Sequence, residues 1–147
     1  MKLPATRADI QALIPHAGDM CLLQRVIGFD EAQLHAQTDS HRDPSNPLRR
    51  DGRLAALHLC EYGAQAMALH GGLLAAREGR SAPPGLLVSL RGVELHCNFI
   101  EQYPGALDVL ALEVADSGAG WQCSFRIEHA GELLASGRAA VLRRPGA

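Results

Sequence analysis

The hydrophobic pattern of the chain is dominated by one stretch, from Leu54 to Gly79, that contains no proline and is rich in Ala, Leu and Met. These residues are strong helix formers, and the apolar ones fall on almost every face of a helix. A helix that is apolar on all sides is usually buried. Its polar interruptions are too frequent for a membrane span, so the pattern predicts a long buried helix from about Leu54 to Ala76.

The segments after this helix alternate between apolar and polar positions, as half-buried β-strands do. Between residues 86 and 97 the apolar phase changes at Gly92, which indicates a β-bulge. Further strands are predicted over residues 107–114, 121–127 and 132–142, with glycine-containing turns between them. The pattern therefore predicts an antiparallel meander of about four strands.

A short helix and a β-hairpin precede the long helix. Thr6 or Asp9 can cap a helix over residues 8–13. Two apolar runs, residues 20–29 and 33–38, are predicted to pair as strands, because they are short and closely spaced.

A polar loop with prolines, residues 39–51, then leads into the long helix. One antiparallel sheet wrapped around one long central helix is an α+β arrangement, and it has the outline of the hot-dog fold. We expect a single hot-dog domain over residues 1–147.

Composition limits the possible functions. A chain of 147 residues that is 47% hydrophobic is large enough to bury one core. Its formal net charge of −2 argues against nucleic-acid binding, and the N-terminus lacks the apolar segment of a signal peptide, so we expect a cytoplasmic protein. The cysteines lie in apolar runs without a CxxC pair, which predicts free thiols and no zinc site; we expect no metal or other cofactor. They are Cys21, Cys60, Cys97 and Cys123.

One ionisable carboxylate, Glu61, interrupts the middle of the apolar helix. His58 one turn earlier and Gln65 one turn later share its face, a stripe roughly 60° wide. A lone carboxylate on a buried helix is costly unless it has a use. Burial favours the neutral acid, so Glu61 could donate a proton in catalysis. It could instead be a structural carboxylate that pairs with His58 or with a backbone amide.

Two segments resemble a known enzyme family. The first segment, IPHAGDMCLLQRV from Ile14, is similar to the opening segment of the FabZ-type 3-hydroxyacyl-acyl-carrier-protein dehydratases. The second, CEYGAQA from Cys60, is similar to the E-A-M-A-Q segment of the helix in that family. The two motifs PH-x-G-x-M and E-Y-x-A-Q most resemble those of the divergent, ApeP-like branch of the family, which is found in aryl-polyene pathways. The resemblance extends over nearly the whole chain. It implies a hot-dog fold with Glu61 as the catalytic acid and Gln65 as its neighbouring glutamine.

The chain departs from this family at the usual catalytic histidine. The family's H-F-P-G motif would place a histidine at residue 47, but Pro47 stands there. We therefore predict that His16, in the Pro-His-Ala-Gly turn, is the base, ahead of His58. Either histidine could instead be structural, His16 in its turn and His58 in the core or at an interface. Two other histidines have weaker cases: His70 and His96.

The implied reaction removes water from a 3-hydroxyacyl thioester to give a trans-2-enoyl thioester, in fatty-acid or polyene biosynthesis. It requires a base for the C2 proton, an acid for the leaving hydroxyl and donors for the thioester oxygen. Amides at the start of the long helix are candidate donors. The acyl group would be carried by an acyl carrier protein or by coenzyme A. A basic cluster could steer an acidic carrier protein or simply be solvated: Arg49, Arg50 and Arg53.

Two other functions remain open. A thioesterase on the same fold would use Glu61 to activate water or to attack the thioester. A non-catalytic or half-catalytic subunit would rely on a partner for the missing histidine. We expect a homodimer, or a heterodimer with another hot-dog subunit. In either assembly we expect His16 and Glu61 within ~10 Å of each other, beside an apolar cleft, because both must reach one substrate.

Overall fold

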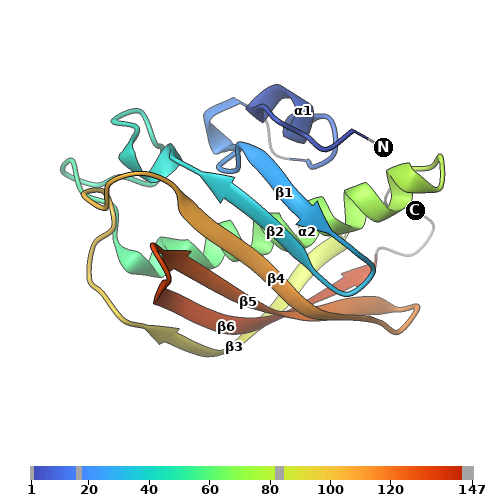
Figure 1. Ribbon diagram of the computed structural model, residues 1–147. Helices are drawn as coiled ribbons and strands as arrows, with labels where there is room; N and C mark the ends of the chain where they lie inside the picture. Colours follow the sequence, from blue (N-terminus) through green and yellow to red (C-terminus); the bar gives the residue numbers. More distant parts are fainter. Residues whose placement is uncertain (1, 16–17, 82–84, 144–147) are drawn as a thin grey trace.

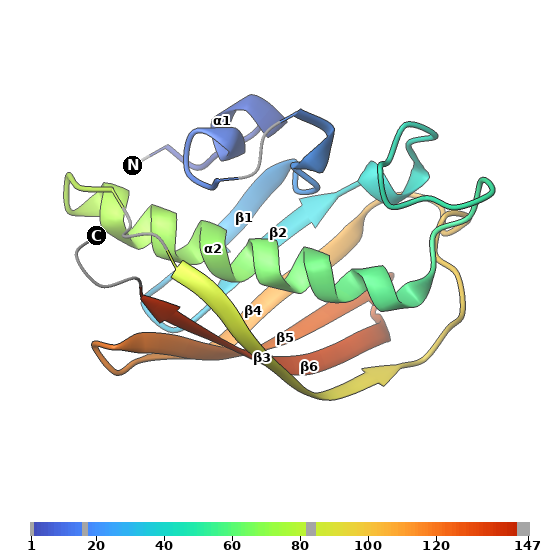
Figure 2. The ribbon, with the colours of Figure 1, turned by 180° about the vertical axis from the view of Figure 1, so that it is seen from behind.

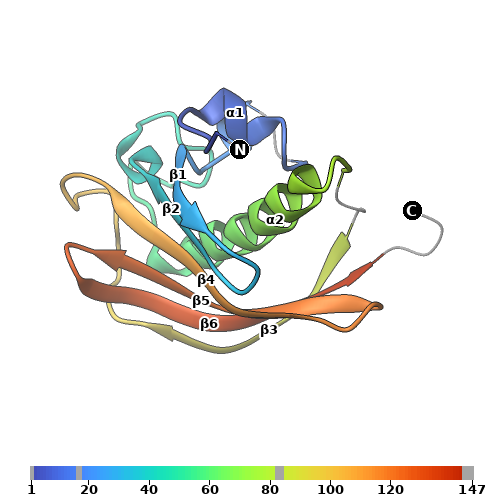
Figure 3. The ribbon, with the colours of Figure 1, turned by 45° about the vertical axis from the view of Figure 1, so that its right-hand side comes forward.

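The computed structural model describes residues 2–15, 18–81 and 85–143. Within these residues, six strands form one sheet in the order β1-β2-β4-β5-β6-β3, and every pairing between neighbours is antiparallel. The sheet curves around the long helix α2 (Leu59–Arg77), as Figures 1 and 3 show. This is the predicted α+β hot-dog arrangement, and the helix occupies the concave face of the sheet.

The strands agree with the sequence pattern except at the first one, which was predicted over residues 20–29 but begins only at Arg25. They are β1 (Arg25–Phe29), β2 (Leu34–Thr38), β3 (Gly85–Leu95), β4 (Leu107–Asp116), β5 (Gly120–His129) and β6 (Glu132–Arg143). The short helices are α1 (Arg7–Gln11), η1 (Gly18–Met20), η2 (Ser40–Arg42) and η3 (Ala56–His58). Within the described residues, no helix has the length and apolar character needed to cross a membrane.

Helix α1 is capped as the sequence indicates. The Thr6 hydroxyl accepts a hydrogen bond from the Asp9 amide at 3.2 Å, and the Asp9 carboxylate accepts one from the Thr6 amide at 3.3 Å. This reciprocal pair is a capping box. Ile10 is buried, and Figure 2 shows α1 above the C-terminal half of α2 and near the start of β1.

The long helix begins later than predicted. Residues before Leu59 form the 3-10 turn η3, and Ala55 is extended because it bridges to Phe99 in the connection between β3 and β4. The Ala56 amide also donates to the carbonyl of Asn98 at 2.8 Å. A backbone that pairs with another segment cannot make the helical hydrogen bonds, so the prediction of a start at Leu54 was wrong.

The predicted four-strand meander was only partly right. Strands β4, β5 and β6 follow one another as hairpins, but β3 pairs with β6 at the far edge and not with β4. The connection from β3 to β4 is long enough to cross the end of the sheet. The β-bulge is confirmed, because the register of β3 shifts between Arg91 and Glu94, where Gly92 has a φ of +60°.

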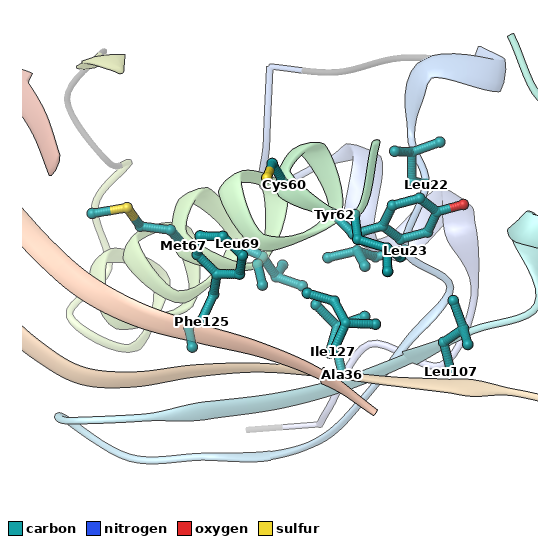
Figure 4. Close-up of a cluster of buried hydrophobic side chains, with 14 of the residues drawn as sticks. Leu22, Leu23, Ala36, Cys60, Tyr62, Met67, Leu69, Leu107, Phe125 and Ile127 are labelled. Carbon is teal, nitrogen blue, oxygen red and sulfur yellow. The ribbon is translucent and has the colours of Figure 1, made fainter. Parts of the chain in front are cut away.

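The core forms where α2 approaches the middle of the sheet. The ring of Phe125, on β5, lies between Gly63 of α2 and Gly137 of β6. A Cβ atom at Gly63 would come within 2.6 Å of the ring, and one at Gly137 within 2.7 Å. Figure 4 shows Phe125 and Ile127 of the sheet beneath Tyr62 and the other buried side chains of α2. The two glycines therefore allow the helix and the sheet to pack closely around one aromatic ring.

The cysteines are free thiols. Cys21, Cys60 and Cys123 are buried and Cys97 is half-buried. Burial raises the pKa of the Cys123 thiol to about 12, so this thiol remains neutral and acts as a small apolar core residue.

Candidate active site

Glu61 lies in the first turn of α2 and is only half-buried. The positive end of the helix dipole favours a carboxylate at this position, whereas partial burial opposes its charge. The carboxylate Oε1 accepts a hydrogen bond from Gln65 Nε2, one turn later, at 3.4 Å. Of the three residues of the predicted stripe, Glu61 and Gln65 are therefore in contact.

Gln65 connects α2 to the segment that precedes β1. Its side chain is fully buried; Nε2 donates to the carbonyl of Met20 at 2.7 Å, and Oε1 accepts from the amide of Leu22 at 2.9 Å. The Gln65 amide thus makes the hydrogen bonds to these two backbone groups that a neighbouring strand would otherwise make. The apolar run accordingly becomes a strand only at Arg25. Gln65 also holds this segment beside Glu61.

The other predicted catalytic residue, His16, lies outside the described residues. In the sequence it precedes Gly18 by two positions, and Gly18 opens the short helix η1 that ends at Met20. The segment that Gln65 binds is therefore the continuation of the Pro-His-Ala-Gly turn.

A second buried network holds Leu22 from its other side. The Leu22 carbonyl accepts hydrogen bonds from the hydroxyls of Thr38 and Ser40, the latter at 2.6 Å. The Tyr62 hydroxyl lies 3.0 Å from the Ser40 hydroxyl and accepts from Asn46 Nδ2 at 3.1 Å. Burial raises the pKa of Tyr62, so the phenol is neutral and available for these bonds.

Sequence reasoning missed this network. The available signal was a tyrosine on the apolar helix, directly after Glu61, because a buried tyrosine hydroxyl usually needs a polar partner. The network also explains the loop around Pro47. Asn46 is buried, donates to the Ser40 carbonyl at 2.9 Å and accepts from the Leu48 amide at 2.9 Å, while Pro47 is exposed at the surface.

The other histidines have distinct environments. His58 lies in η3 and is half-buried; among the described residues its ring makes no hydrogen bond, to Glu61 or to any other group. His70 Nε2 donates to the carbonyl of Asp30 at 2.6 Å, and its ring is buried about 14 Å along the helix axis from Glu61. His96 is exposed. Of these three, His58 alone lies within one helical turn of Glu61.

Three amides at the start of the helix are already used. Those of Ala56 and His58 donate to the carbonyls of Asn98 and Ala55, at 2.8 and 3.1 Å, and that of Leu59 donates within the 3-10 turn. The expectation that these groups bind a thioester oxygen therefore fails for these three amides, because each has a backbone acceptor.

The three arginines of the basic cluster differ in role. Arg49 is half-buried and braces its own loop, since Nη1 donates to the carbonyl of Gly52 at 3.0 Å and Nη2 to that of His41 at 3.1 Å. Arg50 is exposed. The Arg53 guanidinium lies 3.6 Å over the ring of Phe99, with a side chain 52% exposed. Arg53 Nε also lies 3.6 Å from the carboxylate of Glu101, so of these three arginines only Arg50 is exposed without a carboxylate partner among the described residues.

Exposed apolar side chains border the Glu61 region. Met20 is 41% exposed, and Leu57, one helical turn before Glu61, is 60% exposed. Elsewhere, on the edge strand β3, three leucines are also exposed: Leu87, Leu90 and Leu95. Two hollows of the described residues lie on the outer face of the sheet, and Glu61 lines neither of them. The cleft that the sequence predicts beside Glu61 therefore stays a prediction.

The sequence matches the ApeP-like family, described as ApeP dehydratase, over residues 8–146. The chain belongs to the ApeP-like dehydratase family. The resemblance inferred from the two sequence segments is thereby confirmed. No curated protein sequence matches the chain.

Solved structures agree on the fold of this family member. The dehydratase heterocomplex ApeI:P from Xenorhabdus doucetiae superposes with a TM-score of 0.82 at 23% identity, over 93% of this chain and 91% of that one. An HP0420-homologue from Helicobacter felis gives 0.61 at 16% identity, over 92% and 88%. A mutant of the phenylacetic acid degradation protein PaaI from Thermus thermophilus gives 0.55 at 16% identity, over 81% and 91%. Each is similar in fold to this chain.

Proposed function

We propose that this ApeP-like chain takes part in removing water from 3-hydroxyacyl thioesters, with Glu61 as the acid and His16 as the base. Membership of a dehydratase family supports the reaction class. The observation that carries the residue assignment is the Gln65 side chain, which contacts Glu61 and binds the segment that continues from the His16 turn.

The proposed chemistry balances with these two groups. A neutral His16 removes a proton from C2 of the acyl chain, the electron pair forms the C2–C3 double bond, and the C3–O bond breaks. Protonated Glu61 donates its proton to the departing hydroxyl, which leaves as water. Glu61 suits this role because it is half-buried, so a substrate can reach its carboxyl group while partial burial favours the neutral acid.

We further propose that a second hot-dog subunit, identical or different, completes the site along strand β3. Among the described residues this strand is paired only with β6, so its other edge is open, and the strand also carries exposed leucines; proteins usually cover such an edge. The structure with the TM-score of 0.82 is a heterocomplex, which supports a different subunit as the partner. With Pro47 at the usual histidine position, such a partner could also supply a second histidine.

The acyl group is proposed to arrive on an acyl carrier protein or on coenzyme A, in fatty-acid or polyene biosynthesis. Arg50, whose charge faces solvent, would steer an acidic carrier, and exposed Arg53 would contribute less because Glu101 lies 3.6 Å from its Nε. Arg49 is not part of this proposal, because its guanidinium braces the loop.

The proposal is tested by hydration of a short trans-2-enoyl thioester by the purified chain. The reaction is measured as the loss of the enoyl absorbance. We expect Glu61→Gln and His16→Ala each to lower the rate by about 10²–10⁴-fold, the usual contribution of a general acid or base. Glu78→Gln is the matched control, since Glu78 is exposed just after α2 and pairs with Arg80.

The result also separates the alternatives. Steady release of free thiol without hydration would favour a thioesterase and contradict the dehydratase. Activity that appears only when a second hot-dog subunit is added would support the half-site form. An unchanged rate in Glu61→Gln would show that Glu61 is structural.

A further inference from the structure

The outer face of the sheet, turned away from α2, carries a shallow polar hollow between β3 and β4. Residues directly paired across strands point to the same face. Cys123, Phe125 and Ala139 are buried toward the helix, so the alternate residues Ser124 and Arg138 face outward. The hollow has a volume of about 140 Å³ and is independent of the Glu61 site.

Two arginines stand directly opposite each other at this hollow. Arg91 of β3 pairs in register with Arg138 of β6, which in turn pairs with Ser124 of β5. Both arginines are exposed, and among the described residues neither has an ion pair or a hydrogen-bonding partner. Like charges directly opposite in a sheet are destabilising, so this arrangement lacks a structural explanation within the chain.

A third arginine on the same face shows the contrast. Arg126 of β5 lies two residues from Ser124, and its Nε is 3.0 Å from the carboxylate of Glu128. The sheet therefore neutralises one outward arginine with a carboxylate and leaves Arg91 and Arg138 without one.

The neighbouring residues supply further donors and open space. In the adjacent cross-strand row, Gln122, Ala140 and Ser89 lie side by side, and the small Ala140 keeps the centre of the hollow open. Glu113 lines the opposite rim, at a bulge of β4 where its φ is +54°. An anion in the hollow would thus meet two guanidinium groups, with hydroxyl and amide donors beside them and one carboxylate at the far side.

We propose that this hollow binds a phosphate-class anion. Guanidinium groups present paired N–H donors that match phosphate oxygens, and a doubly charged tetrahedral anion can accept from more of these donors than a carboxylate or chloride can. The phosphate has two possible sources with the same chemistry, namely free phosphate and the phosphate groups of coenzyme A.

The test is a titration of the full-length chain with inorganic phosphate at constant ionic strength. Binding is measured from the changes in backbone amide NMR chemical shifts. We expect saturable shifts centred on β6, and affinity at least ~5-fold weaker in Arg91→Gln and in Arg138→Gln, because each loses a charge-assisted contact. Glu113→Gln should bind phosphate more tightly, because it removes a like charge. Arg126→Gln is the matched control and should stay within ~2-fold of the parent affinity, since that arginine is already paired.

A second titration with coenzyme A identifies the source. If coenzyme A binds more tightly than phosphate and this binding is lost in Arg138→Gln, the hollow binds the phosphate groups of coenzyme A. If phosphate binds and coenzyme A binds no more tightly, the hollow binds free phosphate. A lack of saturable shifts at the hollow with both ligands would overturn the proposal. Equal weakening in Arg126→Gln would overturn it too, because it would indicate general charge attraction. Thermal unfolding without added phosphate checks folding, and Arg138→Gln should not melt below the parent chain.

Discussion

The two halves of α2 are both tied to the N-terminal hairpin region by a buried polar side chain, but only one half presents an acid. In the first half, Gln65 binds the backbone of Met20 and Leu22 and contacts the accessible Glu61. In the second half, His70 binds the backbone of Asp30, and no carboxylate of the helix lies beside it. The same kind of anchor can therefore support a reactive group or serve packing alone.

The ionisable ring in the second half is set up to be structural. Burial lowers the pKa of His70, an effect that the hydrogen bond to the Asp30 carbonyl partly opposes. Its Nε2 proton is committed to that carbonyl at 2.6 Å. A histidine in this position gains from remaining neutral and fixed, whereas a catalytic base must reach a substrate.

The largest effect on stability and activity is expected when Gln65 can no longer bind the backbone of Met20 and Leu22. Gln65→Leu keeps the volume but leaves the Leu22 amide without its acceptor inside the protein, which should cost about 1–3 kcal/mol of unfolding free energy. Because the same side chain holds the segment beside Glu61, thioester hydration should fall as well, at temperatures where the variant is fully folded. Chemical denaturation and the enoyl assay measure the two effects.

The control is Gln102→Leu, since Gln102 is exposed. If Gln65→Leu lost stability but kept full hydration activity, the first half of α2 would be no more functional than the second.

The contribution of His70 to the unfolding free energy should depend on pH. The folded-state pKa of His70 lies below its unfolded value of 6.5, so the folded chain binds fewer protons in this range. Its contribution to stability is present above the unfolded pKa and is lost as the pH falls from there toward the folded pKa. His70→Gln should therefore lose less unfolding free energy than the parent chain between about pH 7.5 and 5.5.

His41 is also buried with a lowered pKa and remains in both proteins, so a part of the slope should persist. Hydration activity at neutral pH should be preserved in His70→Gln. A variant with an equal or steeper loss of stability on acidification would show that His70 is not held neutral by burial.

The smallest effect is expected at the surface end of the second half. Arg77 lies 3.6 Å from Glu31, but both side chains are largely exposed to solvent, at 43% and 88%. Its guanidinium is 5.7 Å from the centre of the Phe29 ring. Arg77→Ala should cost no more than about 1 kcal/mol, less at high salt, because solvent screens such pairs. A loss well above this in denaturant titrations would make Arg77 a third true anchor of the helix.

The sequence by itself determined the elements and the family of this protein. The apolar stretch, the alternating segments and the phase change at Gly92 identified the long helix, the strands and the bulge, because these features depend on local periods of the backbone. The stripe of Glu61 and Gln65 also followed from the helical period, and the two motif segments identified the dehydratase family.

Only the tertiary structure decided which segments became partners. The pairing of β3 with β6, the start of α2 at Leu59, and the bracing role of Arg49 each depend on hydrogen bonds to residues distant in sequence or to the folded loop. The partners of Gln65 and the network of Tyr62 arose in the same way. A local period gives the face on which a polar side chain lies, but the group that satisfies it is set by which strands and loops pack there, since a buried polar group must find its partner in the folded chain.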